Sequence, residues 1–299
     1  MPGQFSETLA AASAVSYRMP WGTIKGLCWG NPKDIKYVCT HGWLDNAHSF
    51  LPLAQQYLRN NAMRTQGGLL ALDWAGHGLS DHRPAGTHYH FIDYAYDLWS
   101  LLEQQKWQDI VLVGHSMGGF VSNVTASLCG ERLRHLVLIE AFGLLVSDGE
   151  DAHQQLQSGF SSRQKLTHSK WRDYSELSSA VDARLKSADF SKPLVEILVQ
   201  RGCYRNAQGR WQWRADPRVK ATSPYRLPAS TVEQILTQVK TPITLIRGDK
   251  GYDKVAPAIA RWGHCIDDLS VQGIAGGHHV HMEKPQQLAQ AIATIDATE

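Results

Sequence analysis

The chain has few cysteines and no long apolar run. Its five cysteines stand far apart among 299 residues, and none lies at metal-ligand spacing from another. An odd, scattered set argues against a disulfide framework, so we expect a reducing compartment and a cytoplasmic location. No segment is long and apolar enough to span a bilayer, and the first residues lack the pattern of a signal peptide. We therefore expect no membrane insertion.

An excess of charge of one sign is also missing. Thirty basic residues face 28 acidic ones, for a net charge of +2, and the basic residues form no runs. Proteins that bind nucleic acid usually carry a basic patch or tail, so we expect no nucleic-acid partner. Hydrophobic residues make up 43% of the chain, as is common for a soluble globular protein. These properties favour a protein that acts on a small-molecule substrate, and they leave its oligomeric state open.

Strand-like and helix-like segments alternate over the first 140 residues, and the alternation resumes near residue 236. This order predicts the α/β class, with a doubly wound, mainly parallel sheet and helices on both faces. The expected strands are residues 22–29, 36–40, 68–73, 110–113, 133–140, 241–247 and 269–274. The expected helices are residues 48–60, 90–106, 120–128, 254–263 and 285–294.

Residues 144–235 interrupt this alternation. They are richer in Ser, Gln, Arg and Asp, lack a convincing buried strand, and contain helix-like segments at 151–167, 173–187 and 192–202. We predict a core of residues 1–143 and 236–299, with residues 144–235 inserted as a helical cap after the strand that ends at Glu140. Ligands bind at the carboxyl edge of open α/β sheets, so the cap should cover that edge. Its tryptophans either form a small core of the cap or line an acyl pocket; they are Trp171, Trp211 and Trp213.

The most informative stretch is residues 110–119, Ile-Val-Leu-Val-Gly-His-Ser-Met-Gly-Gly. A β-branched strand runs into a Gly-x-Ser-x-Gly pattern, and a helix-like segment follows directly, which is the context of a nucleophile elbow. Gly114 and Gly118 leave room for backbone to pass close beside a strained residue. We therefore predict that Ser116 is a nucleophile with its Oγ exposed at the tip of the turn.

A serine hydroxyl is a weak nucleophile until a base takes its proton. In a fold with this elbow we expect the base in the loop after the last strand, where three histidines compete. His278 directly follows two glycines, where the chain leaves the sheet edge, and is the predicted base. We expect His279 and His281 to pack against or cap the last helix. His115, beside the serine, should point away from the Oγ of Ser116.

An acyl transfer also needs an oxyanion hole, made of two backbone N–H groups. One should come from Met117, the residue after the nucleophile. The other should come from Trp43, in the loop after the strand that ends at His41-Gly42. We expect the side chain of His41 to brace this loop.

These motifs occur together and in a fixed order. The loop at His41-Gly42-Trp43, the turn at residues 73–81, the elbow at 114–118 and the loop at 277–285 resemble the α/β-hydrolase superfamily. They cover nearly the whole chain outside the insertion. Residues 138–143, 211–218 and 223–227 resemble the serine hydrolase-like branch. The resemblance implies an α/β-hydrolase fold and a reaction that requires no cofactor and no metal.

The acid that orients the histidine departs from the usual pattern of this superfamily. The acid is commonly found after the strand at 241–247, three residues beyond a glycine, and here Gly251 stands at that place. Glu140 ends the strand after the elbow, and a buried carboxylate there needs a partner such as an imidazolium. We favour Glu140, as in the haloalkane dehalogenases, whose acid follows the same strand. Asp249 is the alternative.

Together these residues predict a serine hydrolase, most simply a carboxylesterase, that acts on a carboxylic ester or thioester through an acyl-enzyme on Ser116. Dehalogenases and epoxide hydrolases use an aspartate nucleophile, which this elbow lacks. Cleavage of C–C bonds and perhydrolysis run on the same triad and stay open. A hydrolase-fold protein that binds a small ligand with little turnover is the alternative from another class.

Overall fold

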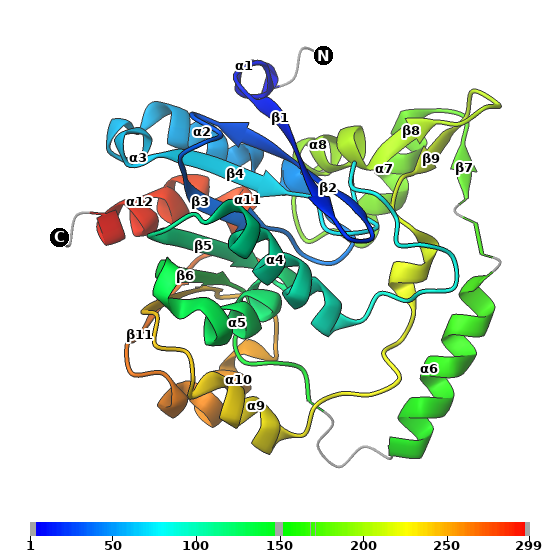
Figure 1. Cartoon of the computed structure of the whole chain (residues 1–299). Coiled ribbons are helices and arrows are strands. Elements are labelled where there is room, and N and C mark those ends of the chain that lie inside the picture. Colours follow the sequence, from blue (N-terminus) through cyan, green and yellow to red (C-terminus); the bar gives the residue numbers. More distant parts are fainter. Residues whose placement is uncertain (1–3, 147–151, 168, 171, 297–299) are drawn as a thin grey trace.

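The computed structural model describes residues 4–146, 152–167, 169–170 and 172–296. Its centre is an eight-stranded sheet in the order β1-β2-β4-β3-β5-β6-β10-β11 (Figure 1). The pairs β1–β2 and β2–β4 are antiparallel, and the other pairs are parallel. The predicted α/β class with a mainly parallel sheet is confirmed. The strands are Ser13–Met19 (β1), Gly22–Trp29 (β2), Ile35–Thr40 (β3), Gly68–Leu72 (β4), Ile110–His115 (β5), Leu133–Ile139 (β6), Ile243–Gly248 (β10) and Leu269–Ile274 (β11).

Helices cover both faces of the sheet (Figure 1). One face carries α2 (Leu51–Arg59), α3 (Asn61–Gln66), α11 (Val280–Glu283) and α12 (Pro285–Asp296), with the short α1 (Ser6–Ala10) against α2. The other face carries α4 (Phe91–Gln105), α5 (Met117–Cys129), α9 (Ala229–Leu236) and α10 (Val255–Trp262). Alternate residues of a strand pack against the helices on opposite faces of the sheet. Leu112 belongs to one apolar cluster, and Val111 and Val113 belong to the other. Burial on both faces explains why β4 and β5 read as nearly continuous apolar runs, whereas the edge strand β11 is mostly exposed.

The segment predicted as a helical cap contains short strands as well as helices; of the strand residues only Cys203 is buried, which agrees with the expectation that it holds no convincing buried strand. It contains α6 (Ala152–Thr167), α7 (Leu177–Leu185) and α8 (Lys192–Gly202), together with β7 (Asp173–Tyr174), β8 (Cys203–Arg205) and β9 (Trp211–Trp213). The three short strands form an antiparallel sheet in the order β7-β9-β8. The helix predicted over 173–187 therefore begins only at Leu177, because Asp173 and Tyr174 pair with β9.

The end of the predicted cap packs with the core. Val232 and Leu236 of α9 are buried in the apolar cluster beneath α5, although α9 lies almost wholly before residue 236. A cap domain over residues 144–235 thus stays a prediction. The last helix of this segment, α9, packs as part of the core. Trp171 lies outside the described residues, whereas Trp211 and Trp213 sit on β9 and are half-buried.

The five cysteines are buried and unpaired. Among the described residues, no helix combines the length and the apolar character that a membrane span requires. The parallel strands β3, β5, β6, β10 and β11 all end at one edge of the sheet. The loops that leave this edge carry every residue predicted to take part in chemistry.

Candidate active site

Ser116 stands between β5 and α5 in a strained backbone conformation, with φ 49° and ψ −117°. A Cβ at Gly114 would lie 2.7 Å from the backbone of Gly119, and one at Gly118 would overlap the carbonyl of Thr40. Both glycines are therefore required for the close approach of backbone around the serine. The sequence-predicted elbow is present, with Ser116 only partly buried.

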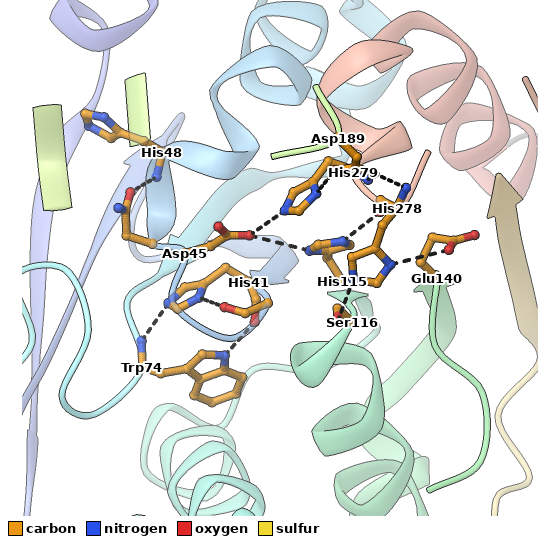
Figure 2. A network of polar contacts seen from close by, with 12 residues as sticks. His41, Asp45, His48, Trp74, His115, Ser116, Glu140, Asp189, His278 and His279 are labelled. Atoms are coloured by element: carbon orange, nitrogen blue, oxygen red, sulfur yellow. Dashed lines mark hydrogen bonds and ion pairs between the residues drawn. The ribbon is translucent and has the colours of Figure 1, made fainter. Parts of the chain in front are cut away.

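His278 faces Ser116 across the sheet edge. Its Nε2 lies 2.9 Å from the Oγ of Ser116, within hydrogen-bond distance, and its Nδ1 lies 3.4 Å from Oε2 of Glu140 (Figure 2). Its side chain is 28% exposed, whereas that of Glu140 is fully buried. The structure thus brings together the three residues predicted as nucleophile, base and acid.

Glu140 follows β6 at a positive φ of 55°, which turns its side chain into the loop after β10. Its Oε1 accepts a hydrogen bond of 2.6 Å from the amide of Gly248, and its Oε2 accepts one from the amide of Tyr252. These donors and the imidazole of His278 offset the cost of burying a carboxylate. A Cβ at Gly251 would overlap this carboxylate, so the glycine leaves the space that Glu140 occupies.

Asp249, the alternative acid, points elsewhere. Its Oδ1 accepts a hydrogen bond of 2.8 Å from the amide of Gly276, and its side chain is exposed. The structure therefore brings Glu140 to His278, whereas Asp249 binds the backbone of the loop that carries the histidine.

The two amides predicted for the oxyanion hole belong to segments beside the nucleophile. A Cβ at Gly42 would lie 3.3 Å from the Cβ of Ser116, so the loop that continues to Trp43 passes close to the serine. The indole of Trp43 donates a 3.0 Å hydrogen bond to the carbonyl of Val219, which ties this loop to the inserted segment. Met117 is the first residue of α5, where backbone N–H groups have no partner within the helix. Their use by an oxyanion stays a prediction.

His41 braces this loop, as expected. Its Nε2 accepts a hydrogen bond of 3.1 Å from the amide of Trp74, so Nδ1 carries the proton and donates to the carbonyl of Gly42 at 2.7 Å. The indole of Trp74 donates back to the carbonyl of His41 at 2.9 Å. Burial lowers the pKa of His41, which keeps the ring neutral.

The sequence analysis missed a charged cluster behind the candidate base. We expected His279 to pack against or cap the last helix, but its Nδ1 lies 2.7 Å from Asp189 and its Nε2 lies 3.1 Å from Asp45 (Figure 2). Burial opposes a charge on this ring, yet the two carboxylates raise the pKa of His279 to about 9. Arg184 pairs with Asp45 at 3.2 Å. No sequence motif marks Asp189, which lies 89 positions from its partner His278.

The other histidines of this region are buried and neutral. Nε2 of His115 lies 3.0 Å from the carbonyl of His278, and it is the ring of His278 that lies within hydrogen-bond distance of the Oγ of Ser116. The ring of His281 packs against that of His115, with ring centroids 4.0 Å apart and the ring planes tilted by 34°. Burial lowers the pKa of both rings well below the usual range.

A metal ion fits this cluster less well than a proton does. Donor atoms of Asp45, His115 and His279 lie within 4.8 Å of one another, a spacing that could hold a cation. However, His279 uses both ring nitrogens for carboxylates, and with a pKa of about 9 its ring is already the cation of the cluster. A metal would have to displace that proton first.

Comparison with known proteins gives consistent matches. Residues 38–285 match the family model described as the alpha/beta hydrolase fold. A serine hydrolase-like protein of Danio rerio is 27% identical over 300 aligned residues, which cover 96% of this chain and 90% of that protein. The crystal structure of a hypothetical protein from Pseudomonas aeruginosa PAO1 superimposes with a TM-score of 0.83 at 31% identity, covering 95% of this chain and 99% of that one. A thioesterase domain from the curacin biosynthetic pathway shares the fold, with a TM-score of 0.79 at 22% identity over 94% of this chain and 99% of that domain.

Proposed function

This chain belongs to the α/β-hydrolase superfamily and resembles its serine hydrolase-like branch, and from that premise we propose that it hydrolyses a small carboxylic ester or thioester through an acyl-enzyme on Ser116. The observation that carries the proposal is the 2.9 Å contact between Oγ of Ser116 and Nε2 of His278. Glu140 at the other ring nitrogen supports the same assignment.

In the proposed reaction, Nε2 of His278 takes the hydroxyl proton while Oγ of Ser116 attacks the acyl carbon. The carbonyl oxygen becomes an oxyanion that the amides of Trp43 and Met117 stabilise. His278 then gives its proton to the leaving alcohol or thiol as the C–O or C–S bond breaks. Water, deprotonated by the same ring, releases the acid. Glu140 keeps the proton on Nδ1 and stabilises the imidazolium, and no step needs a cofactor.

A cavity of about 390 Å³ next to the base supports an apolar acyl group. Its walls include Phe120, Phe142 and Tyr252, and the ring of Tyr252 meets the ring of His278 edge-on at 5.5 Å. None of the described cap tryptophans lines it; Trp213 lines a second, more polar cavity instead. We infer that the acyl chain enters between α5 and α10.

The test is a panel of p-nitrophenyl esters and acyl thioesters of increasing chain length. We expect turnover by the wild type and none by Ser116→Ala. Ser127→Ala, a matched change at a half-buried serine of α5, the helix that follows Ser116, should behave as the wild type does. A folded wild type that binds but does not cleave any member of the panel would contradict the proposal and favour a ligand-binding protein.

A further inference from the structure

One carboxylate from the inserted segment binds the backbone of the loop that carries the candidate base. Asp189 lies between α7 and α8, and its Oδ2 accepts hydrogen bonds from the amides of His278 and, at 3.3 Å, of His279. Its Oδ1 lies 2.7 Å from Nδ1 of His279. A Cβ at Gly277 would overlap this carboxylate, so the glycine before the base admits it.

We propose that Asp189 is a positioning residue that holds the backbone of His278 in the place from which Nε2 reaches Ser116. The inference rests on the proposed function, since it takes His278 as the base. It assigns to the inserted segment a direct part in assembling the site, beyond covering it.

The same cluster reaches the loop of the predicted oxyanion hole. Nε2 of His279 contacts Asp45, which is buried two residues after Trp43. Asp45 and Asp189 carry two negative charges, and His279 and Arg184 carry two positive ones, so the cluster is neutral as a whole. Balanced charges reduce the cost of burial. The loop that carries His278, the loop that carries Trp43 and the inserted segment are therefore fixed relative to one another by one set of contacts.

Attachment of the inserted segment does not depend on Asp189. The guanidinium of Arg201 on α8 binds Asp73 at 2.6 Å and 2.9 Å, and both side chains are buried. Asn46 donates a 2.9 Å hydrogen bond to the carbonyl of Leu198, also on α8. Loss of the Asp189 contacts should therefore free the loop that carries His278, while α8 stays on the core.

The expected effect is on rate more than on stability. The side chain of Asp189 is 39% exposed, and ion pairs at such positions stabilise a fold by only about 0–1 kcal/mol. A catalytic group displaced by about 1 Å, in contrast, can cost roughly 100-fold in rate.

The experiment compares Asp189→Ala with Asp189→Asn. Alanine removes every acceptor, whereas asparagine keeps an oxygen for the two amides and can donate from its NH₂ to a neutral His279. We expect kcat to fall about 10- to 100-fold in Asp189→Ala, with little change in KM, and to recover largely in Asp189→Asn. Asp182→Ala is the matched control, because Asp182 pairs with Lys192 in the same segment but is 61% exposed; its kcat should equal that of the wild type.

The outcomes separate this inference from the proposed function. An unchanged kcat in Asp189→Ala, or equal losses in Asp189→Ala and Asp189→Asn, would overturn the positioning role while the wild type still turns over. A wild type without turnover would instead refute the proposed function. Should Asp189→Ala fail to fold, Asp189→Ser, whose hydroxyl is too short to bind both amides, must show the same loss of kcat.

Discussion

Gly251 and Glu140 share one space at the carboxyl edge of the sheet. A Cβ at position 251 would overlap the carboxylate that Glu140 extends from the end of β6. The common superfamily pattern has an acid where Gly251 stands. In this chain the glycine at that position leaves the space that the carboxylate of Glu140 occupies. The carboxylate reaches the same histidine from the neighbouring strand.

We first predict that the two candidate acids differ in their effect on rate. Glu140→Gln should lower kcat by about 10²- to 10⁴-fold, because a neutral amide does not stabilise the imidazolium that forms on His278. Asp249→Asn should leave kcat near the wild-type value, since the amide oxygen of asparagine can still accept the hydrogen bond from the amide of Gly276. Steady-state kinetics on both variants checks this, and the opposite ranking would move the acid to the later strand.

The carboxylate that orients His278 should also be able to act from position 251 in place of position 140. Glu140→Ala should be nearly inactive, and adding Gly251→Asp to it should restore activity at least tenfold, about 1.4 kcal/mol of transition-state stabilisation. The single variant Gly251→Asp should be impaired, because its side chain competes with Glu140 for one space. A double variant no faster than Glu140→Ala would show that the two positions are not equivalent.

The sequence predicted the elements whose signal is local. The elbow at Ser116 was readable because a buried strand, two obligatory glycines and a helix follow one another directly. Trp211 and Trp213 were not recognised as strand residues, because β9 has only three residues, too few for a pattern to show.

Residues that only the fold brings together left no local pattern in the sequence. Asp189 is one acidic residue in a polar segment, and only the fold brings it to the amides of His278 and His279. Glu140 could be favoured over Asp249 by its place after a buried strand, but the side-chain directions that separate them come from the backbone turn at Glu140.

The ion pairs of His279 predict a loss of stability at alkaline pH. Asp45 and Asp189 raise its pKa to about 9 against the effect of burial, above the 6.5 of an unfolded chain. Their stabilisation is therefore complete below pH 6.5 and is lost as the pH rises through about 9, at most on the order of 3 kcal/mol. Urea unfolding between about pH 7 and pH 10 should show this loss in the wild type. In His279→Gln the free energy of unfolding should be lower at neutral pH and should fall less over this range; parallel curves would contradict the assignment.

Two buried histidines that are neutral in the folded protein lead us to predict a second loss of stability, at acid pH. Burial lowers the pKa of His77 to about 3 and that of His48 to about 4. Because the unfolded chain binds these protons first, the free energy of unfolding should fall as the pH drops below 6.5. His77→Gln should make this fall shallower by up to about 1.4 kcal/mol per pH unit, measured by urea unfolding. His264→Gln is the control, since His264 is 64% exposed, and an equal change in both variants would refute the prediction.

The most direct test of the central claim is the intact mass of the protein after exposure to a fluorophosphonate probe. An activated serine displaces fluoride and keeps the phosphonyl group. We predict a single adduct on the wild type, none on Ser116→Ala, and much slower labelling of His278→Ala. A folded wild type without an adduct, or an equal adduct on Ser116→Ala, would contradict the assignment of Ser116 as the nucleophile.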